Sequence, residues 1–148
     1  MVPTHPPLLL VEDSPEDRVA TMRAFKKAGL VNPIYCCANG DEALDFLYRR
    51  GSYTDPGLAP RPGVILLDLN MPGTDGREVL NDIKNNEDLK TIPVIVLTTS
   101  SDARDIQSCY QSGANSYVTK PVDLAGFFQA IERLKNWWFE VIVLPETR

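Results

Sequence analysis

In the stretch VILLDLNMPGTDG, residues 64–76, an apolar run typical of a buried strand ends in a lone carboxylate, Asp68. Taking a charged group out of water without a partner costs several kcal/mol. Other parts of the chain must therefore supply partners for Asp68 if it is more than the cap of a strand. The glycines and the proline of MPGTDG predict a turn that leads from this strand into a helix.

Four further apolar runs recur along the chain, and segments with helical spacing separate them. The runs are LLLV (8–11), IYCCA (34–38), VIVLTT (94–99) and SYVT (116–119). Regular alternation of strands and helices, with nearly continuous apolar strands, predicts a parallel sheet that is covered on both faces. The predicted class is therefore α/β, a flavodoxin-like (βα)5 fold with a doubly wound five-stranded parallel sheet in the order 2-1-3-4-5.

Helical periodicity is clear after the first run, where Val19, Met22, Ala24 and Phe25 follow a period of about 3.6 residues. Ser14, which precedes a proline and two acidic residues, is typical of an N-cap. Further helices are expected in DEALDFLYRR, GREVLNDIKNN, ARDIQSCYQSGA and DLAGFFQAIERLKNWWF, and a surface loop is expected in the proline- and glycine-rich segment GSYTDPGLAPRPG.

Length and composition indicate one domain over residues 1–148, with a core at about 7–135 and an apolar extension at 136–148. The apolar fraction of 43% and the charged fraction of 24% are those of a globular protein. A net charge of −5 argues against direct DNA binding, which needs a basic face. The N-terminus lacks the features of a secretory signal, and no apolar run reaches the ~20 residues that span a bilayer.

The three cysteines predict neither a zinc site nor a disulfide framework. Cys36 and Cys37 are adjacent, Cys109 is distant, and no pair has CxxC spacing. Free thiols packed as small apolar side chains fit a cytoplasmic protein. The only histidine, His5, lies in a proline-rich leader, which disfavours hydrolases that use a Ser-His-Asp or Cys-His arrangement.

In a sheet of the predicted order, ligands bind at the carboxyl ends of the strands where the order reverses, between the first and third strands. Glu12 and Asp13 follow the first strand, and Asp68 follows the third. Three carboxylates raise one another's pKa, and a divalent cation relieves that repulsion. Oxygen ligands in this number suit Mg²⁺. Thr98 and Lys120, at the ends of the fourth and fifth strands, add a hydroxyl and a positive charge.

This constellation predicts an aspartyl-phosphate site. A carboxylate can accept a phosphoryl group by in-line transfer, with little covalent work from the protein. Mg²⁺ and Lys120 would neutralise the phosphoryl oxygens, and Thr98 would offer its hydroxyl to one of them. Taken singly, each of these residues has an ordinary structural explanation; the ordered set across five strands indicates the site.

The motifs VEDS (11–14), LLDLNMPGTDG (66–76), LTTS (97–100) and YVTKP (117–121), in this order and spacing, resemble the CheY-like receiver domain of two-component response regulators. The resemblance covers about residues 7–135. It implies a signalling phosphoacceptor that catalyses its own phosphorylation and dephosphorylation, rather than a separate class of enzyme.

The resemblance also implies roles for the acidic residues. Asp68 would accept the phosphoryl group from a phosphohistidine of a sensor histidine kinase. Asp13 and Asp68 would bind Mg²⁺ directly, Glu12 would act through a water molecule, and the backbone carbonyl of Asn70 would complete the set of protein ligands.

A conformational switch is implied as well. In receivers, the hydroxyl at Thr98 and the ring at Tyr117 move together after phosphorylation, and the Lys120–Pro121 peptide bond would be cis. One position departs from the family: Thr99, directly after the switch hydroxyl, stands where a small residue is common. A branched side chain there would narrow access to the phosphoryl group and alter the turnover rate.

The tail NWWFEVIVLP is the other distinguishing feature. Trp137, Trp138, Phe139 and Val141 form an apolar extension, and such surfaces usually mark an interface. We expect a homodimer built from the fourth and fifth helices and this extension, although the same side chains could fold back onto their own domain. With this tail, the chain resembles the small stand-alone response regulators that partner bacterial phytochrome histidine kinases, which signal to partner proteins without an attached output domain.

Three other functions compete. A flavin-binding electron carrier would need a hydroxyl- and glycine-rich loop after the first strand, where the chain has the acidic segment VEDSPED. A haloacid-dehalogenase-type phosphatase would need Asp-x-Asp, but Asn70 stands at that spacing after Asp68. A receiver-like scaffold that acts without phosphorylation would not need an intact phosphorylation site.

Overall fold

The computed structural model describes residues 5–146 and has the predicted alternation of strands and helices. The strands are β1 (Leu8–Val11), β2 (Ile34–Cys37), β3 (Val64–Leu67), β4 (Val94–Thr98) and β5 (Ser116–Thr119). The helices are α1 (Pro15–Lys27), α2 (Gly40–Tyr48), α3 (Gly76–Lys84), α4 (Ala103–Gln111) and α5 (Leu124–Asn136), with a 3-10 turn η1 (Gly51–Tyr53) and a π-helical turn η2 (Trp137–Val141).

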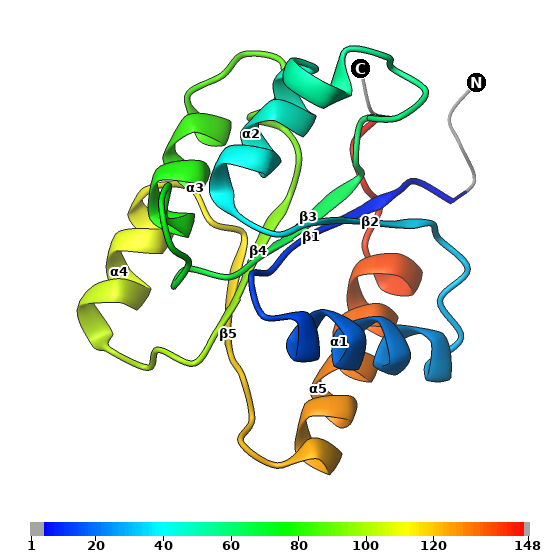
Figure 1. Ribbon diagram of the computed structural model, residues 1–148. Helices are drawn as coiled ribbons and strands as arrows, with labels where there is room; N and C mark the ends of the chain where they lie inside the picture. Colours follow the sequence, from blue (N-terminus) through cyan, green and yellow to red (C-terminus); the bar gives the residue numbers. More distant parts are fainter. Residues whose placement is uncertain (1–4, 147–148) are drawn as a thin grey trace.

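The strands form one parallel sheet in the order β2-β1-β3-β4-β5, which confirms the predicted topology. Successive side chains of a strand point to opposite faces, so each apolar strand feeds two cores. Leu8 and Leu10 of β1 pack with α1 and α5, whereas Leu9 and Val11 pack with α2, α3 and α4. The two groups of helices lie on opposite sides of the sheet (Figure 1).

Helix ends at the carboxyl edge of the sheet are fixed by local hydrogen bonds. Ser14 is the N-cap of α1, as predicted, and its hydroxyl accepts from the backbone N–H of Asp17 at 3.2 Å. Asp75 caps α3 and accepts from the N–H of Arg77. Gly76 has no room for a side chain, because a Cβ there would lie 2.1 Å from the carbonyl oxygen of Asp68. The MPGTDG turn therefore packs α3 closely against the end of β3.

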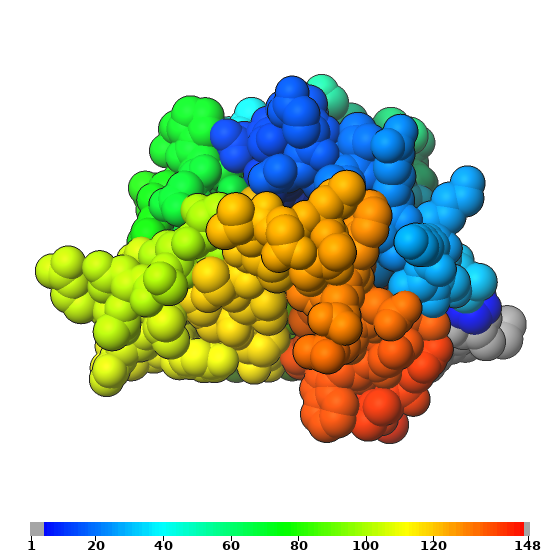
Figure 2. Space-filling view, turned by 90° about the horizontal axis from the view of Figure 1, so that it is seen from below, coloured from blue at the N-terminus to red at the C-terminus, as the bar shows by residue number. Residues whose placement is uncertain are grey.

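The apolar tail folds back onto its own domain for part of its length. Trp138 is 8% exposed and belongs to the core between the sheet and α5, and Phe139 packs against the same core. Because Trp138 is buried in its own domain, the expectation that it serves an intermolecular interface is corrected, whereas Phe139 is only half-buried. Trp137 and Val141 point outward and are 53% and 60% exposed. The residues of the tail lie next to α5 at the surface (Figure 2).

All three cysteines are free, and Cys37 and Cys109 are buried while Cys36 is half-buried. None of the helices within residues 5–146 is long and apolar enough to cross a bilayer.

Candidate functional site

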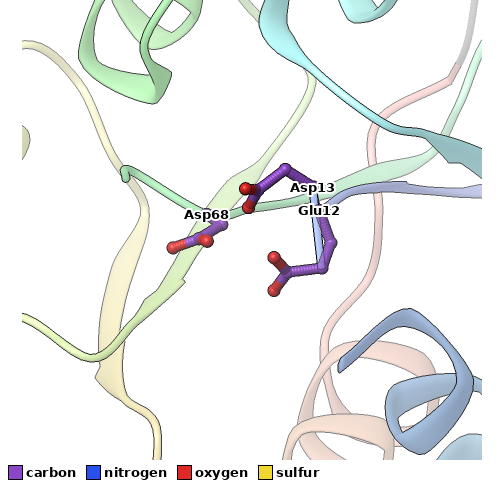
Figure 3. A group of neighbouring side chains, drawn as sticks. All are labelled: Glu12, Asp13 and Asp68. Carbon is purple, nitrogen blue, oxygen red and sulfur yellow. The ribbon is translucent and has the colours of Figure 1, made fainter. Parts of the chain in front are cut away.

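Three carboxylates meet at the carboxyl edge of the sheet, as the strand order predicts. Val11 pairs with Leu67 in the β1–β3 ladder, so the residues that follow these strands are neighbours. One carboxylate oxygen of each of Glu12, Asp13 and Asp68 lies within 4.8 Å of those of the other two. Figure 3 shows the three side chains gathered at the ends of the two strands. Such a group of hard oxygen donors fits a divalent cation.

Lys120 lies inside this acidic group and offsets part of its negative charge. Its Nζ is 2.5 Å from Oε1 of Glu12, 3.0 Å from Oδ2 of Asp17 and 3.7 Å from Oδ2 of Asp68. The side chain of Lys120 is 8% exposed. The backbone N–H of Lys120 donates to the carbonyl of Thr98 at 2.7 Å, which fixes the residue at the end of β5. A phosphoryl group on Asp68 would therefore find a positive charge beside it.

Burial and neighbouring charges shift the pKa values of Glu12 and Lys120. Glu12 is 2% exposed, and its burial raises its pKa to about 7, although the hydrogen bond from Lys120 opposes the rise. Burial alone would lower the pKa of Lys120, but the hydrogen bond to Glu12 and the charge of Asp68 outweigh it and raise that pKa. Lys120 therefore stays protonated, while Glu12 is the member of the site whose charge depends on pH near neutrality.

Thr98 and Tyr117 lie on one hydrogen-bonded path. Thr98 is fully buried, and its hydroxyl accepts from Asn70 Nδ2 at 3.4 Å and from the N–H of Ser100 at 3.5 Å. The hydroxyl of Tyr117 donates to the carbonyl of Ser100 at 2.9 Å. The segment after β4 thus connects the edge of the acidic site to the ring of Tyr117, which is half-buried against the core.

Asp105 on α4 anchors the same segment. It accepts from the hydroxyl of Ser100 at 2.7 Å and from Nε of Arg77 at 3.0 Å. Arg77 in turn donates to Asp75 at 2.9 Å. Hydrogen bonds from Ser100 and Arg77 lower the pKa of Asp105, so it stays ionised. The start of α4 is thereby tied to the start of α3, beside the turn that follows Asp68.

The Lys120–Pro121 peptide bond differs from the cis conformation expected from the sequence. No peptide bond between residues 5 and 146 is cis, so this bond is trans and the predicted cis bond is wrong. An X–Pro bond favours trans by about 0.5–1 kcal/mol on its own. The trans form already brings Nζ of Lys120 into contact with Glu12, so the ion pair does not require the other isomer.

The sequence reasoning placed Glu12, Asp13, Asp68 and Lys120 correctly together but did not identify two groups of partners. Asp17 is one of the two acidic residues that follow the N-cap and favour a helix start in the sequence, and in the structure it also binds Lys120. A signal was available, since the first turn of α1 begins at the edge of the sheet that carries the acidic pair. The bonds of Asp105 to α3 and to the segment after β4 could not be found this way, because they join elements far apart in the chain.

The comparisons with known proteins agree with this geometry. A family model described as "Response regulator receiver domain" matches residues 8–132. The response regulator Rcp1 of Synechocystis sp. is 40% identical over 144 residues, which is 96% of either chain.

Two solved structures are also similar over nearly the whole chain. The Mn(2+)-bound form of Rcp1 has a TM-score of 0.88 and 40% identity, and the alignment covers 95% of this chain and 99% of that one. The phosphorylated cyanobacterial phytochrome response regulator RcpA has a TM-score of 0.90 and 37% identity, with 96% and 99% covered.

Proposed function

The chain belongs to the response regulator receiver family, and on this premise we propose that it accepts a phosphoryl group on Asp68 within a two-component phosphorelay. The observation that carries the proposal is the position of Asp68. Its carboxylate lies within 4.8 Å of Glu12 and Asp13 on one side and 3.7 Å from the ammonium group of Lys120 on the other. A carboxylate so placed is both a nucleophile and a metal ligand.

The transfer follows from the chemistry of these groups. A carboxylate oxygen of Asp68 attacks the phosphorus of a phosphohistidine, the P–N bond breaks, the imidazole leaves with the electron pair, and an acyl phosphate forms. Lys120 pairs with a phosphoryl oxygen, and the hydroxyl of Thr98 donates to another. Mg²⁺, held directly by Asp13 and Asp68, through water by Glu12 and by the carbonyl of Asn70, would offset the charge on the phosphoryl oxygens.

The same groups support self-catalysed dephosphorylation, with water as the attacking nucleophile. The side chain of Thr99 is exposed and lines a surface cavity together with Lys120. A branched side chain there narrows the approach of water. We therefore expect the phosphorylated protein to lose its phosphoryl group more slowly than a Thr99→Ala variant, and the decay of labelled protein measures this.

Phosphorylation would change the positions of Thr98 and Tyr117. Movement of the Thr98 hydroxyl toward a phosphoryl oxygen would break its contacts with Asn70 and Ser100. Because Tyr117 donates to the carbonyl of Ser100, the ring would follow that segment. The segment after β4 would then be the two-state element whose balance the phosphoryl group shifts.

The proposed donor is a sensor histidine kinase of the phytochrome type. The support is the similarity to the phytochrome response regulator RcpA and to Rcp1 over nearly the full length of each. The proposed output is contact with partner proteins rather than DNA, because the net charge is −5. A net negative charge opposes the approach of DNA phosphates and weakens binding that depends on counterion release.

A homodimer is the proposed assembly, and its face is α4, β5 and the outward side of the tail. Tyr110 and Trp137 are 49% and 53% exposed, and β5 is an edge strand. A groove of about 490 Å³ runs between β5 and the end of α5, lined in part by Val118 and Trp137. A second copy of this surface would bury the exposed aromatic rings and cover the sheet edge.

Light scattering tests the dimer. Trp137→Arg is expected to give a monomer, whereas Val31→Arg, at an apolar residue that is 68% exposed near the other sheet edge, should leave the mass unchanged. A monomeric wild type, with and without phosphorylation, would refute the proposed assembly.

Labelling with acetyl phosphate and Mg²⁺ tests the phosphorylation site. Wild type is expected to gain one phosphoryl group, and Asp68→Asn is expected to lose the label. Asp82→Asn, the same chemical change at an exposed residue of α3, should keep it. A wild type that stays unlabelled but still binds its partner would favour the alternative of a receiver-like scaffold.

A further inference from the structure

Lys120 contacts one more carboxylate than phosphoryl transfer requires. Glu12 and Asp68 belong to the proposed metal and phosphoryl site, whereas Asp17 stands on α1 and takes no part in that chemistry. Nevertheless, Oδ2 of Asp17 lies 3.0 Å from Nζ of Lys120, closer than the 3.7 Å between Lys120 and Asp68. In the resting protein, Lys120 is therefore held nearer to Asp17 than to the residue whose phosphoryl group it must meet.

Asp17 is held in place by the rest of its helix. Its backbone N–H donates to the hydroxyl of Ser14, the N-cap, at 3.2 Å. The neighbouring Arg18 donates to the backbone carbonyls of Glu12 and Asp13 at 2.7 and 3.1 Å, which fastens the first turn of α1 to the end of β1. The carboxylate of Asp17 is thus presented to Lys120 by a fixed element.

The contact borders a cavity at the surface. Asp17, Thr99, Lys120 and Pro121 help to line a space of about 610 Å³ between α1 and the segment that joins β5 to α5. Helices α1 and α5 lie side by side on this face of the molecule (Figure 2). Asp17 therefore acts where solvent and ions have access, and its own side chain is 47% exposed.

We propose that Asp17 is a positioning residue for Lys120, which holds the ammonium group in the resting state and competes with the phosphoryl group for it. The inference rests on the proposed function, because it assumes that Lys120 binds phosphoryl oxygens. Asp17 is 47% exposed, so water screens its attraction for the buried Lys120 and the effect is modest, about two- to fivefold in an equilibrium constant.

Removal of the carboxylate has opposite consequences for the two ligands of the site. In Asp17→Asn, Lys120 keeps only Glu12 and Asp68 as partners, so it competes more strongly with Mg²⁺ for their oxygens. The affinity for Mg²⁺ should therefore fall. At saturating Mg²⁺, Lys120 is released more easily to a phosphoryl group, so the affinity for a phosphoryl mimic should rise. A residue that merely supports the fold would lower both affinities.

The probe is beryllofluoride, which adds to a carboxylate as a phosphoryl mimic, titrated at saturating Mg²⁺ and followed by NMR. Asp17→Asn is expected to bind it roughly two- to fivefold more tightly than wild type, and to bind Mg²⁺ more weakly by a similar factor. Glu16→Gln is the matched control, because this substitution removes an equal charge from the same turn of α1. Glu16 is exposed and accepts a hydrogen bond from Ser14 rather than from Lys120. Asp17→Glu, which restores the carboxylate, should return both affinities toward wild type.

The outcomes separate this inference from the proposed function. If Asp17→Asn and Glu16→Gln change the two affinities alike, or if Asp17→Asn weakens the binding of both Mg²⁺ and beryllofluoride, the positioning role is refuted. The proposed phosphoacceptor function of Asp68 would still stand. If wild type binds no beryllofluoride with Mg²⁺ present, the proposed function fails and the inference fails with it.

Discussion

The titration of Glu12 predicts that metal binding at this site is linked to a proton. Burial raises the pKa of Glu12 from 4.5 to about 7. A cation prefers the ionised carboxylate, so below pH 7 it must displace a proton. With that pKa, roughly a tenth of the protein has Glu12 ionised at pH 6 and roughly nine tenths at pH 8. The affinity for Mg²⁺ should thus be about tenfold weaker at pH 6 than at pH 8.

The same pKa predicts how stability depends on pH in the metal-free protein. Between pH 4.5 and 7 the folded state holds a proton on Glu12 that the unfolded chain has released, so stability falls as the pH rises through this window. The difference of 2.5 pH units between the two pKa values corresponds to about 3 kcal/mol at most. Mg²⁺ binds only the folded state and should restore stability above pH 7.

Calorimetric titration with Mg²⁺ from pH 6 to 8 measures the linkage, because the released proton makes the observed heat depend on the buffer. Glu12→Gln should show neither the pH dependence nor the proton release, whereas Glu16→Gln should keep both. An affinity of wild type that is constant from pH 6 to 8 would show that Glu12 is already ionised and that burial does not dominate its titration.

Three further changes test other parts of the structure. Trp138→Ala should lower the free energy of unfolding by about 3–5 kcal/mol and the melting temperature by roughly 10 °C. Trp137→Ala, at a mostly exposed ring, should lower the free energy of unfolding by less than about 1 kcal/mol. Equal losses of stability in the two variants would refute the packing of the tail. Asp105→Asn should speed amide exchange of the segment after β4 by about three- to tenfold, and Asp82→Asn, at an exposed residue of α3, is the control. Gly40→Ala, whose Cβ would lie 2.1 Å from a carbonyl oxygen of the turn after β3, should weaken Mg²⁺ binding in a titration. Unchanged binding would show that this turn does not position the metal ligands.

The arrangement of the acidic site was predictable because it depends on topology alone. Apolar runs bounded by turn residues indicate parallel strands, and parallel strands bring their carboxyl ends to one edge. Glu12, Asp68 and Lys120 follow three such strands directly, so their proximity needs no knowledge of side-chain packing. Distances and burial then come from the structure, as in the 2.5 Å contact between Lys120 and Glu12.

It was less predictable which face of α1 packs against the core. Of its apolar residues, Ala24 and Phe25 are buried, whereas Val19 and Met22 are 49% and 40% exposed. Thr21 is buried instead, since its hydroxyl donates within the helix at 2.7 Å and so needs no water. Hydrophobic periodicity locates a helix, but a satisfied polar side chain can take an inward position that the pattern assigns to an apolar one.

The tail illustrates a different limit. A run such as WWFEV contains enough apolar residues for either an internal or an intermolecular surface, and the sequence left both open. The π-helical turn η2 resolves this by directing Trp138 toward the core and Trp137 toward solvent. Neighbouring identical residues therefore have different roles, which depend on local backbone geometry rather than on composition.

Charge at the site sets the order in which ligands can bind. Glu12, Asp13, Asp17 and Asp68 bring four negative charges when all are ionised. Lys120 brings one positive charge, and Arg18, which donates to the carbonyls of Glu12 and Asp13, brings a second, so the metal-free pocket has a formal charge of −2. A phosphoryl donor is itself an anion and meets repulsion there. A divalent cation would bring this charge to zero. Lys120 could then turn from Asp17 to a phosphoryl oxygen while the cation offsets the charge of the carboxylates. Metal binding should therefore precede phosphorylation, and the ion pair with Asp17 keeps Lys120 in the site until that step.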